Sequence, residues 1–486
     1  MSKQKGMDEQ NRLFFARVAE SAFTNPFGDE RVQSDRKAVG SESDVSFDEV
    51  LERLLAELDQ RLAALGRQGP LEWHRMEGSD GANLSIGILF SVFHRYIRSF
   101  DELIRRQIEA GDASCSAPFT GDVYEALQKQ GFTRSEAGLY VAIFYQLRRA
   151  YYFIANGLVG DSACMKQLRK RLWDNIFTHD SRWYVRCFWN RMEDFSTLLL
   201  GETGTGKGAA AFALGCSGFI PFEPSRRCFA ESFTRAFISI NLSQYPESLI
   251  ESELFGHRKG AFTGAVEKHD GVFSRCSPHG AIFLDEIGDA AVPVQIKLLQ
   301  VLQQRTFSPV GGHESLRFGG RVIAATNQDI GRLRRTGRFR DDFYYRLCSD
   351  EIVLPSLSRR IQELPSELEA LVRHILARLS GGVSTEMLGR VMEALEKDVG
   401  RGYAWPGNVR ELEQAVRRVL LTGAYGGDRA AASGDDATAA FERGELTVAE
   451  LTAAYCTRLF ARFGRYEEVA KRTGLDWRTV KKYVEK

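Results

Sequence analysis

The chain has 486 residues, a length that suggests about three domains, and its 43% hydrophobic share is that of an ordinary globular protein. A net charge of +1 excludes a strong overall field for nucleic acid, so a basic surface has to be local. The eight cysteines form no C-x-x-C pair and no zinc-type cluster, which fits unpaired thiols in a reducing cytosol. No secretory signal or bilayer-spanning run is present, so we expect a cytoplasmic protein with no membrane partner.

The first 157 residues predict a mostly helical regulatory domain. Residues 1–45 are polar and charged, which predicts a mobile arm, although the phenylalanines at 13–27 also fit a short helix packed on its own domain. Beyond residue 47, apolar residues recur at helical spacing, as at Leu139, Ile143 and Leu147. These stripes predict a helical core and not a cofactor site.

A glycine-rich loop follows a short apolar strand at 195–200 and precedes an alanine-rich helix. Such a loop cradles phosphate, because its backbone N–H groups and the helix N-terminus attract anionic oxygens, and Lys207 adds a charge for the β- and γ-phosphates. A strict P-loop has Ser or Thr next, to hold magnesium, whereas this chain has Gly208, so the motif alone leaves a loop without nucleotide as an alternative. The predicted nucleotide-binding residues here are Gly201, Glu202, Thr203, Gly204, Thr205, Gly206, Lys207 and Gly208.

A second glycine-bracketed stretch is ELFGHRKGAFTGA at residues 253–265. Glycine permits a sharp, positive-φ backbone. Phe262 and Thr263, which lie between two glycines, therefore fit a loop tip, where binding residues concentrate. The alternative is a buried hairpin turn with Phe262 in the core.

An apolar run at 281–284 ends in two carboxylates, Asp285 and Glu286. Continuous apolar runs are typical of buried parallel strands, and the acids would lie at the carboxyl end, where open α/β sheets bind ligands. We expect Asp285 to hold Mg²⁺ and Glu286 to polarise the attacking water. The alternative is that the two acids cap the next helix.

Together these motifs resemble those of the sigma-54-dependent transcriptional activators, the bacterial enhancer-binding AAA+ ATPases. The resemblance covers residues 158–421, beginning with LVGDSACM at 158–165, where the family's chain wraps the adenine. Its most specific part is GAFTGA with the flanking ELFGH. This chain departs from the family at Arg258, usually acidic, and at Gly208, usually glutamate. The sigma-54 contact that the resemblance implies is made by Gly260, Ala261, Phe262, Thr263, Gly264 and Ala265.

The resemblance assigns roles to further residues. Asn241 is implied to hold the catalytic Glu286 until the GAFTGA loop moves. Thr326 and Asn327 match the first sensor, which feels the γ-phosphate, and Arg410 matches the second sensor in the motif at 405–412.

The segment FRDDFYYRL resembles the one that carries the family's arginine fingers. Arg340 and Arg346 would then reach the ATP of a neighbouring subunit, because arginine offers a planar fork to phosphate. That geometry implies a ring, expected to be a hexamer. The alternative for both arginines is surface salt bridging. Extra residues relative to the family, at 180–190 and 219–231, are expected to be surface loops.

Residues 423–445 are rich in Gly, Ala and Asp and predict a linker. Three helices are expected between 446 and 484, with Gly474 in the last turn and Asp476 as a cap, which make a helix-turn-helix. Residues 465–486 hold seven basic and four acidic residues. The unit resembles the Fis-like domain that ends this family; the alternative is a solvated tail. The residues expected to bind DNA are Arg478, Thr479, Lys481 and Lys482.

The predicted fold is multidomain: a helical N-terminal domain, an α/β AAA+ P-loop core with a helical lid, and an all-α C-terminal domain. The expected boundaries are 1–157, 158–356 for the α/β subdomain, 357–422 for the lid, 423–445 for the linker and 446–486 for the helix-turn-helix.

The predicted function is hydrolysis of ATP with Mg²⁺, coupled to promoter opening by sigma-54 RNA polymerase, on a chain bound to enhancer-like double-stranded DNA. One alternative is a DNA-binding regulator that senses ATP without hydrolysing it, which Gly208 favours. Another is a remodelling motor of a different kind, such as an unfoldase, which the GAFTGA loop and the helix-turn-helix disfavour.

Overall fold

A computed structural model describes residues 7–40, 46–67, 71–400, 402–427 and 447–484. The chain divides into two compact units, one of Met1–His374 with Gly407–Arg410 and one of Ile375–Pro406 with Glu411–Lys486. Most of the predicted linker, residues 428–445, lies outside the described residues. No helix in the described part of the chain is both long and apolar enough to cross a membrane.

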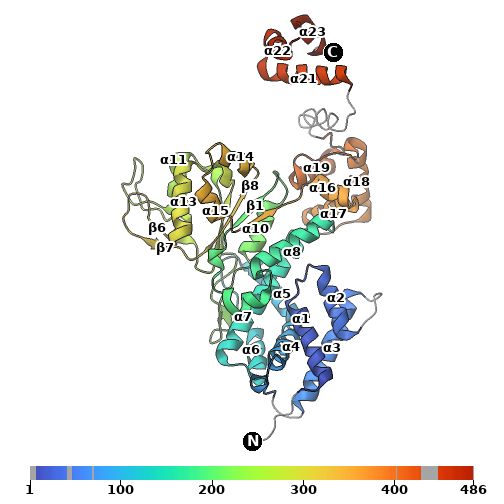
Figure 1. The fold of residues 1–486 in the computed structure, drawn as a ribbon, viewed down its shortest axis with the longest axis vertical. Coiled ribbons are helices and arrows are strands. Elements are labelled where there is room, and N and C mark those ends of the chain that lie inside the picture. Colours follow the sequence, from blue (N-terminus) through green and yellow to red (C-terminus); the bar gives the residue numbers. More distant parts are fainter. Residues whose placement is uncertain (1–6, 41–45, 68–70, 401, 428–446, 485–486) are drawn as a thin grey trace. The chain divides into compact units, whose positions relative to one another are not determined.

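The N-terminal part of the first unit is helical, as the sequence predicts (Figure 1). The longest helix begins with a capping box, in which the Thr133 side chain accepts from the Glu136 amide and the Glu136 carboxylate accepts in return. The helices are α1 (Glu9–Phe23), α2 (Asp29–Val39), α3 (Phe47–Gly66), α4 (Asp80–Arg95), α5 (Ile97–Ala110), α6 (Phe119–Lys129), α7 (Arg134–Gly157) and α8 (Ala163–Phe177).

The predicted mobile arm at residues 1–45 is wrong for the described residues of that range. They form α1 and α2, and Phe14, Phe15 and Val18 of α1 are buried in the core. The Asp8 side chain caps α1 by accepting from the Asn11 amide at 2.8 Å. The polar composition suggested disorder, but the apolar stripe of α1 provides enough apolar surface to pack. This agrees with the alternative, a short helix packed on its own domain.

A five-stranded sheet forms the centre of the first unit, with the order β4-β5-β8-β1-β9 and every pair parallel. The register pairs Leu200 with Thr326 and Asn241 with Asp285, so the predicted site residues come together at the carboxyl edge. The strands are β1 (Thr197–Leu200), β4 (Phe237–Asn241), β5 (Ala281–Asp285), β8 (Arg321–Thr326) and β9 (Asp350–Val353).

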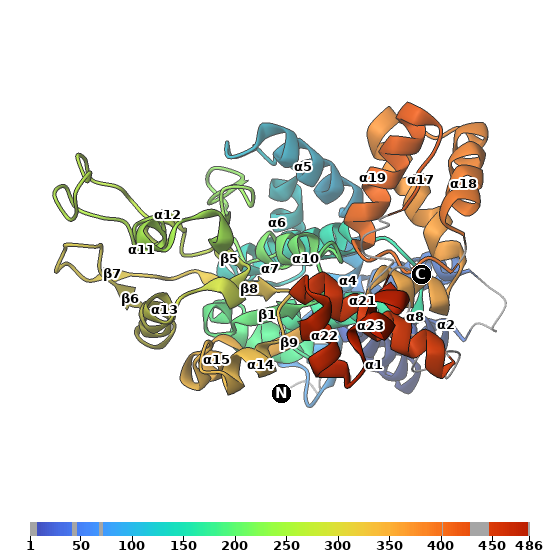
Figure 2. The same cartoon turned by 90° about the horizontal axis from the view of Figure 1, so that it is seen from above.

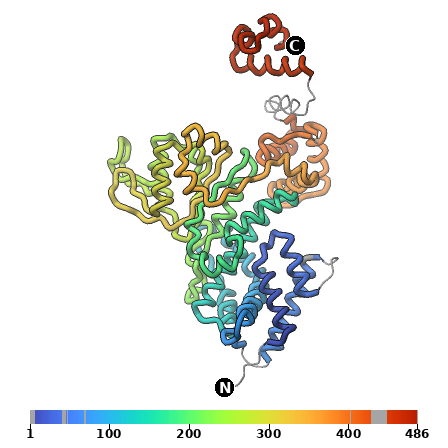
Figure 3. The backbone as a smooth tube through the Cα atoms, viewed as in Figure 1, coloured from blue at the N-terminus to red at the C-terminus, as the bar shows by residue number. Residues whose placement is uncertain are grey.

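Apolar side chains cover both faces of this sheet. One face, which includes Leu198 and Leu284, packs against α13 (Val292–Gln304) and α15 (Asp341–Leu347). The other face packs against α10 (Lys207–Gly215), and its hydrophobic cluster continues into the N-terminal helices. Figure 3 shows the chain running from those helices through α7 and α8 into the sheet. The N-terminal helices and the sheet therefore share one core.

The two extra segments lie largely at the surface, as the sequence predicts, but both have secondary structure and are not simple loops. Residues 180–190 include the short helix α9 (Ser181–Trp183) and a π-helical turn whose Tyr184 is fully buried. Residues 219–231 form an antiparallel hairpin of β2 (Phe222–Glu223) and β3 (Cys228–Phe229). Both phenylalanines of this hairpin are buried. The apolar surface that these segments bury comes from aromatic side chains, namely Tyr184, Phe222 and Phe229.

The second unit has only helices among its described elements, and two of them, α17 (Ser366–Ser380) and α19 (Asn408–Thr422), begin in the first unit. α18 (Thr385–Val399) lies between them in sequence. The C-terminal helices α21 (Val448–Phe463), α22 (Tyr466–Thr473) and α23 (Trp477–Val484) have a small core of Cys456, Val469 and Val480.

Candidate functional site

The glycine loop lies between the end of β1 and the start of α10, as the motif predicts. Gly204 and Gly206 have φ values of 80° and 101°, which favour glycine. A Cβ on Gly204 would lie 2.2 Å from the carbonyl oxygen of Gly407, so no side chain fits there. The loop therefore presents bare backbone at a helix N-terminus, which is the arrangement that attracts phosphate oxygens.

Lys207 is the first residue of α10 and is buried. Its Nζ donates to the carbonyl oxygens of Gly201 at 2.8 Å and Glu202 at 3.1 Å, so the ammonium is held over the loop. Burial lowers the pKa of Lys207, and the nearby Glu286 and Asp285 oppose that shift. The site thus places one cation between the glycine loop and the carboxylate pair.

The resemblance implies that Asn241 contacts Glu286. In the structure it contacts the neighbouring carboxylate, Asp285. Its Nδ2 donates to Oδ2 of Asp285 at 3.4 Å, while its Oδ1 accepts from the Ser243 amide at 2.9 Å. Among the described residues, no hydrogen bond joins Asn241 to Glu286. The register is the reason, because Asn241 and Asp285 are directly paired across β4 and β5.

Glu286 is turned away from the strand by a left-handed backbone with φ of 54°. Its carboxylate accepts from the backbone amide of Asn327 at 3.4 Å. Burial raises the pKa of Glu286, and the adjacent Asp285 raises it further. A carboxylate with a raised pKa is a better base towards water at neutral pH.

The two predicted first-sensor residues end β8 beside the glycine loop. Thr326 is fully buried, and its hydroxyl accepts from the Gln328 amide at 3.1 Å. The Nδ2 of Asn327 donates to the Thr203 hydroxyl at 2.8 Å. Asn327 therefore connects the Glu286 carboxylate to the glycine loop: its backbone amide donates to Glu286 and its side chain donates to Thr203.

Asn408 is a further residue of the site, which the sequence analysis did not single out. It is fully buried, and its Nδ2 donates to the Glu202 carboxylate at 2.9 Å and to the Thr203 carbonyl at 3.1 Å. Its Oδ1 accepts from the Leu357 amide at 2.7 Å. The Gly-Asn pair ahead of a helix was a usable signal, since asparagine tolerates a positive φ in turns and Asn408 has φ of 52°.

Arg410, the predicted second sensor, follows in the same segment. The amide of Val409 donates to the Gly204 carbonyl at 3.1 Å, which fixes the start of α19 on the glycine loop. The charge of Arg410 is close enough to contribute to lowering the pKa of Lys207. The structure thus brings Arg410 to the phosphate end of its own site.

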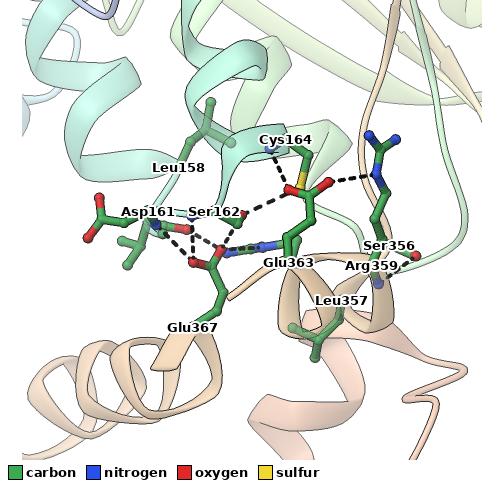
Figure 4. Close-up of polar contacts among 12 residues, drawn as sticks. Leu158, Asp161, Ser162, Cys164, Ser356, Leu357, Arg359, Glu363 and Glu367 are labelled. Carbon is green, nitrogen blue, oxygen red and sulfur yellow. Dashed lines mark hydrogen bonds and ion pairs between the residues drawn. The ribbon is translucent and has the colours of Figure 1, made fainter. Parts of the chain in front are cut away.

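A partly buried set of hydrogen bonds, here called the latch, connects residues 158–165, where the resemblance places adenine, to α16 (Leu357–Glu363) and the start of α17 (Figure 4). The Glu367 carboxylate accepts from the amides of Asp161 at 2.8 Å and Ser162 at 3.1 Å, and from Nε of Arg360 at 2.8 Å. Glu363 accepts from the Cys164 amide at 2.7 Å. No sequence pattern marked this latch, because its two halves are about 200 residues apart.

The two predicted arginine fingers are held elsewhere. Arg340 pairs with Asp342, with Nη2 to Oδ2 at 2.6 Å. Nε of Arg346 donates to the Leu302 carbonyl at 2.9 Å. In the described part of the chain no hydrogen bond or ion pair joins either arginine to the glycine loop.

The GAFTGA loop is exposed and closed on itself, because the Gly260 amide donates to the Ala265 carbonyl at 2.8 Å. Gly260 and Gly264 have φ of 79° and 103°. Phe262 is 37% exposed, and its ring lies edge-on to the His257 ring with centroids 4.9 Å apart. The alternative of a buried hairpin with Phe262 in the core is therefore wrong.

A second loop supports the GAFTGA loop from the β6–β7 hairpin (Thr306–Phe307 and Leu316–Arg317), and Figure 2 shows the two extending in the same direction. The Val310 amide donates to the Gly256 carbonyl at 2.9 Å. Arg258, where the family usually has an acid, pairs with Glu314 at 2.8 Å. The basic residue is thus matched by an acid on the neighbouring loop.

In the C-terminal helices the predicted DNA-binding side chains lie on one exposed face. Arg478, Lys481 and Lys482 of α23 are exposed, Thr479 is half-buried, and Val480 between them is buried. The Asp476 carboxylate accepts from the Arg478 amide at 2.9 Å, as expected of a cap.

The residues of the site fit a magnesium nucleotide. Bare backbone, one buried lysine and a helix N-terminus suit the phosphates, and Asp285 supplies one carboxylate. Mg²⁺ takes one or two carboxylates together with phosphate oxygens and waters. Gly208 has no side chain to add a ligand, so Asp285 is the protein ligand that the site offers.

A parallel sheet with a glycine loop, a strand-end carboxylate pair and a polar sensor strand defines an AAA+ ATPase domain. Residues 188–353 match the family model described as the sigma-54 interaction domain. This part of the chain is therefore similar to the sigma-54 interaction domain.

Two transcriptional or Nif-specific regulatory proteins are similar to about half of the chain. The DNA-binding transcriptional regulator NtrC of Azospirillum brasilense is 42% identical over 228 residues, which are 46% of this chain and 43% of the relative. The Nif-specific regulatory protein of Klebsiella pneumoniae is 39% identical over 266 residues, 55% of this chain and 44% of the relative. The chain thus spans less than half of each of these relatives. A crystal structure of NtrX from Brucella abortus with ATP is 21% identical, with a TM-score of 0.40, over 74% of this chain and 79% of that one.

Proposed function

We propose that this protein is an ATP-hydrolysing transcriptional activator, which binds DNA and remodels sigma-54 RNA polymerase to open promoters. The observation that carries the proposal is the path from the nucleotide site to the GAFTGA loop. Asn241 bonds Asp285 at the end of β4, and the chain then continues through α11 (Glu247–Phe255) directly into that loop. One hydrogen bond and a short stretch of chain therefore connect the carboxylates to the exposed aromatic tip.

In this proposal ATP with Mg²⁺ supplies the phosphoanhydride bond whose hydrolysis releases free energy. Lys207 and the loop amides bind the phosphates, and Asp285 holds the metal. Glu286 orients the attacking water and accepts its proton. Asn327 connects Glu286 to the glycine loop, so that a change at the γ-phosphate moves both.

The remaining parts of the proposal follow the same family. Arg340 and Arg346 act on the ATP of a neighbouring subunit in a ring, expected to be a hexamer. The exposed basic face of α23 binds an enhancer-like site on double-stranded DNA, and the protein works in the cytoplasm. The domain boundaries predicted from the sequence stay predictions.

A second candidate function is an ATP-sensing DNA-binding regulator that does not hydrolyse ATP. Gly208 favours it, because the position after the P-loop lysine offers no metal ligand or hydrogen-bonding group. The raised pKa of Glu286 and its contact with Asn327 favour hydrolysis instead, since a regulator without turnover needs no tuned base.

One pair of assays on the full chain separates these functions. Purified protein is tested for phosphate release, and then for promoter melting by purified sigma-54 holoenzyme with ATP or a non-hydrolysable analogue. We expect phosphate release and ATP-dependent melting, with no melting on the analogue. Nucleotide binding without phosphate release would establish the second candidate, and phosphate release without melting would point to another kind of motor.

A further inference from the structure

The N-terminal helix α7 holds the far end of the P-loop helix α10 (Figure 1). Nη1 of Arg149 donates to the Cys216 carbonyl at 2.6 Å, and Nη2 donates to the Gly218 carbonyl at 2.7 Å. Nε2 of Gln146 donates to the Ser217 carbonyl between them at 2.8 Å. Three successive carbonyls just after the last turn of α10 are thus bonded by two side chains of α7.

Arg149 is fully buried, and among the described residues its Nε has no hydrogen-bond partner and no carboxylate forms an ion pair with its guanidinium. Burying an unpaired charge is costly, and burial lowers the pKa of this guanidinium. The Cys216 and Gly218 carbonyl oxygens that accept from Arg149 lie just beyond the C-terminus of α10, where a helix carries partial negative charge, and Glu231 adds a favourable interaction with the guanidinium. The arginine binds that helix end electrostatically as well as through its hydrogen bonds.

The hairpin at 219–231 also packs against this part of α7. The Tyr145 ring lies 4.4 Å from the Arg149 guanidinium and stacks on Phe229 of the hairpin, with centroids 4.0 Å apart. One turn further along α7, Phe153 packs edge-on against Phe212 of α10 at 5.2 Å. The face of α7 that carries these residues is therefore built around α10 and not only around the N-terminal core.

α10 is nine residues long, or about 13 Å, so its first and last turns are close together. Its first residue is Lys207, so whatever fixes its last turn also fixes the lysine and the amides that meet phosphate. We propose that Arg149 is a positioning residue of the nucleotide site, through which the N-terminal helical domain sets the affinity for ATP and ADP. This inference rests on the proposed function in that the site binds nucleotide.

The test compares Arg149→Gln with Arg148→Gln in the full chain, with the Kd of a fluorescent ADP analogue and the melting temperature as readouts. Arg148 is the matched control, because it is the neighbouring arginine of α7 and its Nη2 donates to Asp101 inside the N-terminal domain at 2.8 Å. We expect Arg149→Gln to raise Kd about tenfold, within the usual range for coupled sites. Arg148→Gln should change Kd less than about twofold, and Arg149→Lys should recover part of the loss because it keeps the charge.

Equal Kd values for the two glutamine variants would overturn the inference and leave the proposed function standing. A wild-type chain that binds no nucleotide would overturn both. If Arg149→Gln does not fold, hydrogen exchange on the wild-type chain decides. ADP should then slow amide exchange in α7 around residues 145–153, relative to α3, because coupling is reciprocal. Unchanged exchange in that part of α7 would also overturn the inference.

Discussion

Nδ2 of Asn241 donates to Oδ2 of Asp285 at 3.4 Å, and the two residues are directly paired across β4 and β5. The asparagine at the root of the segment that leads to the GAFTGA loop is therefore bonded to the expected metal ligand. A displacement of Asp285 would therefore be felt by Asn241, at the start of the segment that leads to α11, through this one hydrogen bond. The neighbouring Glu286 instead accepts a hydrogen bond from the backbone amide of Asn327, just after β8.

Lys207→Ala and Glu286→Gln should separate nucleotide binding from hydrolysis. Lys207→Ala removes a charged donor from the phosphates and should raise the Kd for ATP about tenfold or more. Glu286→Gln keeps the shape of the site but removes the base, so binding should persist while kcat falls ~10²-fold or more. Fluorescent-nucleotide titration and phosphate release measure the two effects. Wild-type turnover by Glu286→Gln would show that another group is the base.

The acidic limb of the pH profile should belong to Glu286. Its pKa is raised by burial and by Asp285, and the base must be deprotonated to accept a proton. We therefore expect kcat to fall, as the pH is lowered, at a higher pH than an ordinary glutamate with a pKa of about 4.3 would give. The profile is measured at saturating ATP, with melting curves to exclude unfolding. The same limb in the residual activity of Glu286→Gln would refute the assignment.

Arg340→Ala and Arg346→Ala should each reduce hydrolysis without unfolding the chain. A finger supplied by a neighbouring subunit is worth ~10³-fold or more, and neither residue is buried here. Arg335→Ala is the matched control, because Arg335 is 74% exposed on α14 (Ile330–Arg335). Phosphate release and thermal unfolding are measured on all three variants. A variant of either finger that hydrolyses ATP as fast as Arg335→Ala would remove that arginine from the active site.

Mixing Arg346→Ala with Glu286→Gln subunits should restore part of the activity, since some interfaces then carry both intact groups. Phosphate release by the mixture, compared with each variant alone, measures the rescue. Absence of rescue in rings shown to contain both kinds of subunit would argue against a shared site.

Phe262→Ala and Thr263→Ala should abolish promoter opening while hydrolysis continues. The loop carries no ionisable group, and Phe262 is 37% exposed, so its removal should change the free energy of unfolding by under about 1 kcal/mol. A buried phenylalanine would cost ~3–5 kcal/mol. Phosphate release, promoter melting and thermal unfolding are measured on the same preparations. A stable Phe262→Ala protein that still opens promoters at the wild-type rate would remove the loop from the mechanism.

Reversing the charge of Lys481 and Lys482 should weaken DNA binding and flatten its dependence on salt. Each phosphate contact that is lost lowers the slope of log K against log salt by about 0.9. Lys471→Glu is the control, because Lys471 is an exposed lysine on α22 and not on α23. Binding is measured by anisotropy on duplex DNA at several salt concentrations. Identical slopes for the control and the double variant would support the solvated-tail alternative.

The parts of this protein that are built from contiguous residues could be predicted from the sequence. The glycine loop, the apolar strand that ends in Asp285 and Glu286, and the loop around Phe262 are each set by local backbone and side-chain chemistry. The helices of the C-terminal domain were also predictable, since their caps and turns lie within a few residues of one another. The structure places these elements as expected because nothing distant has to be known to form them.

The contacts between residues that are distant in the sequence could not be predicted and are known from the folded structure. The strand register pairs Asn241 with Asp285 and not with Glu286. Packing turned the extra residues at 219–231 into a hairpin against α7, and it ordered α1 and α2 where composition suggested a mobile arm. The contact of Arg149 with the end of α10 joins residues about 70 positions apart. Such contacts depend on the register of strands and on the shape of a shared core. Neither of these can be predicted from a local sequence pattern.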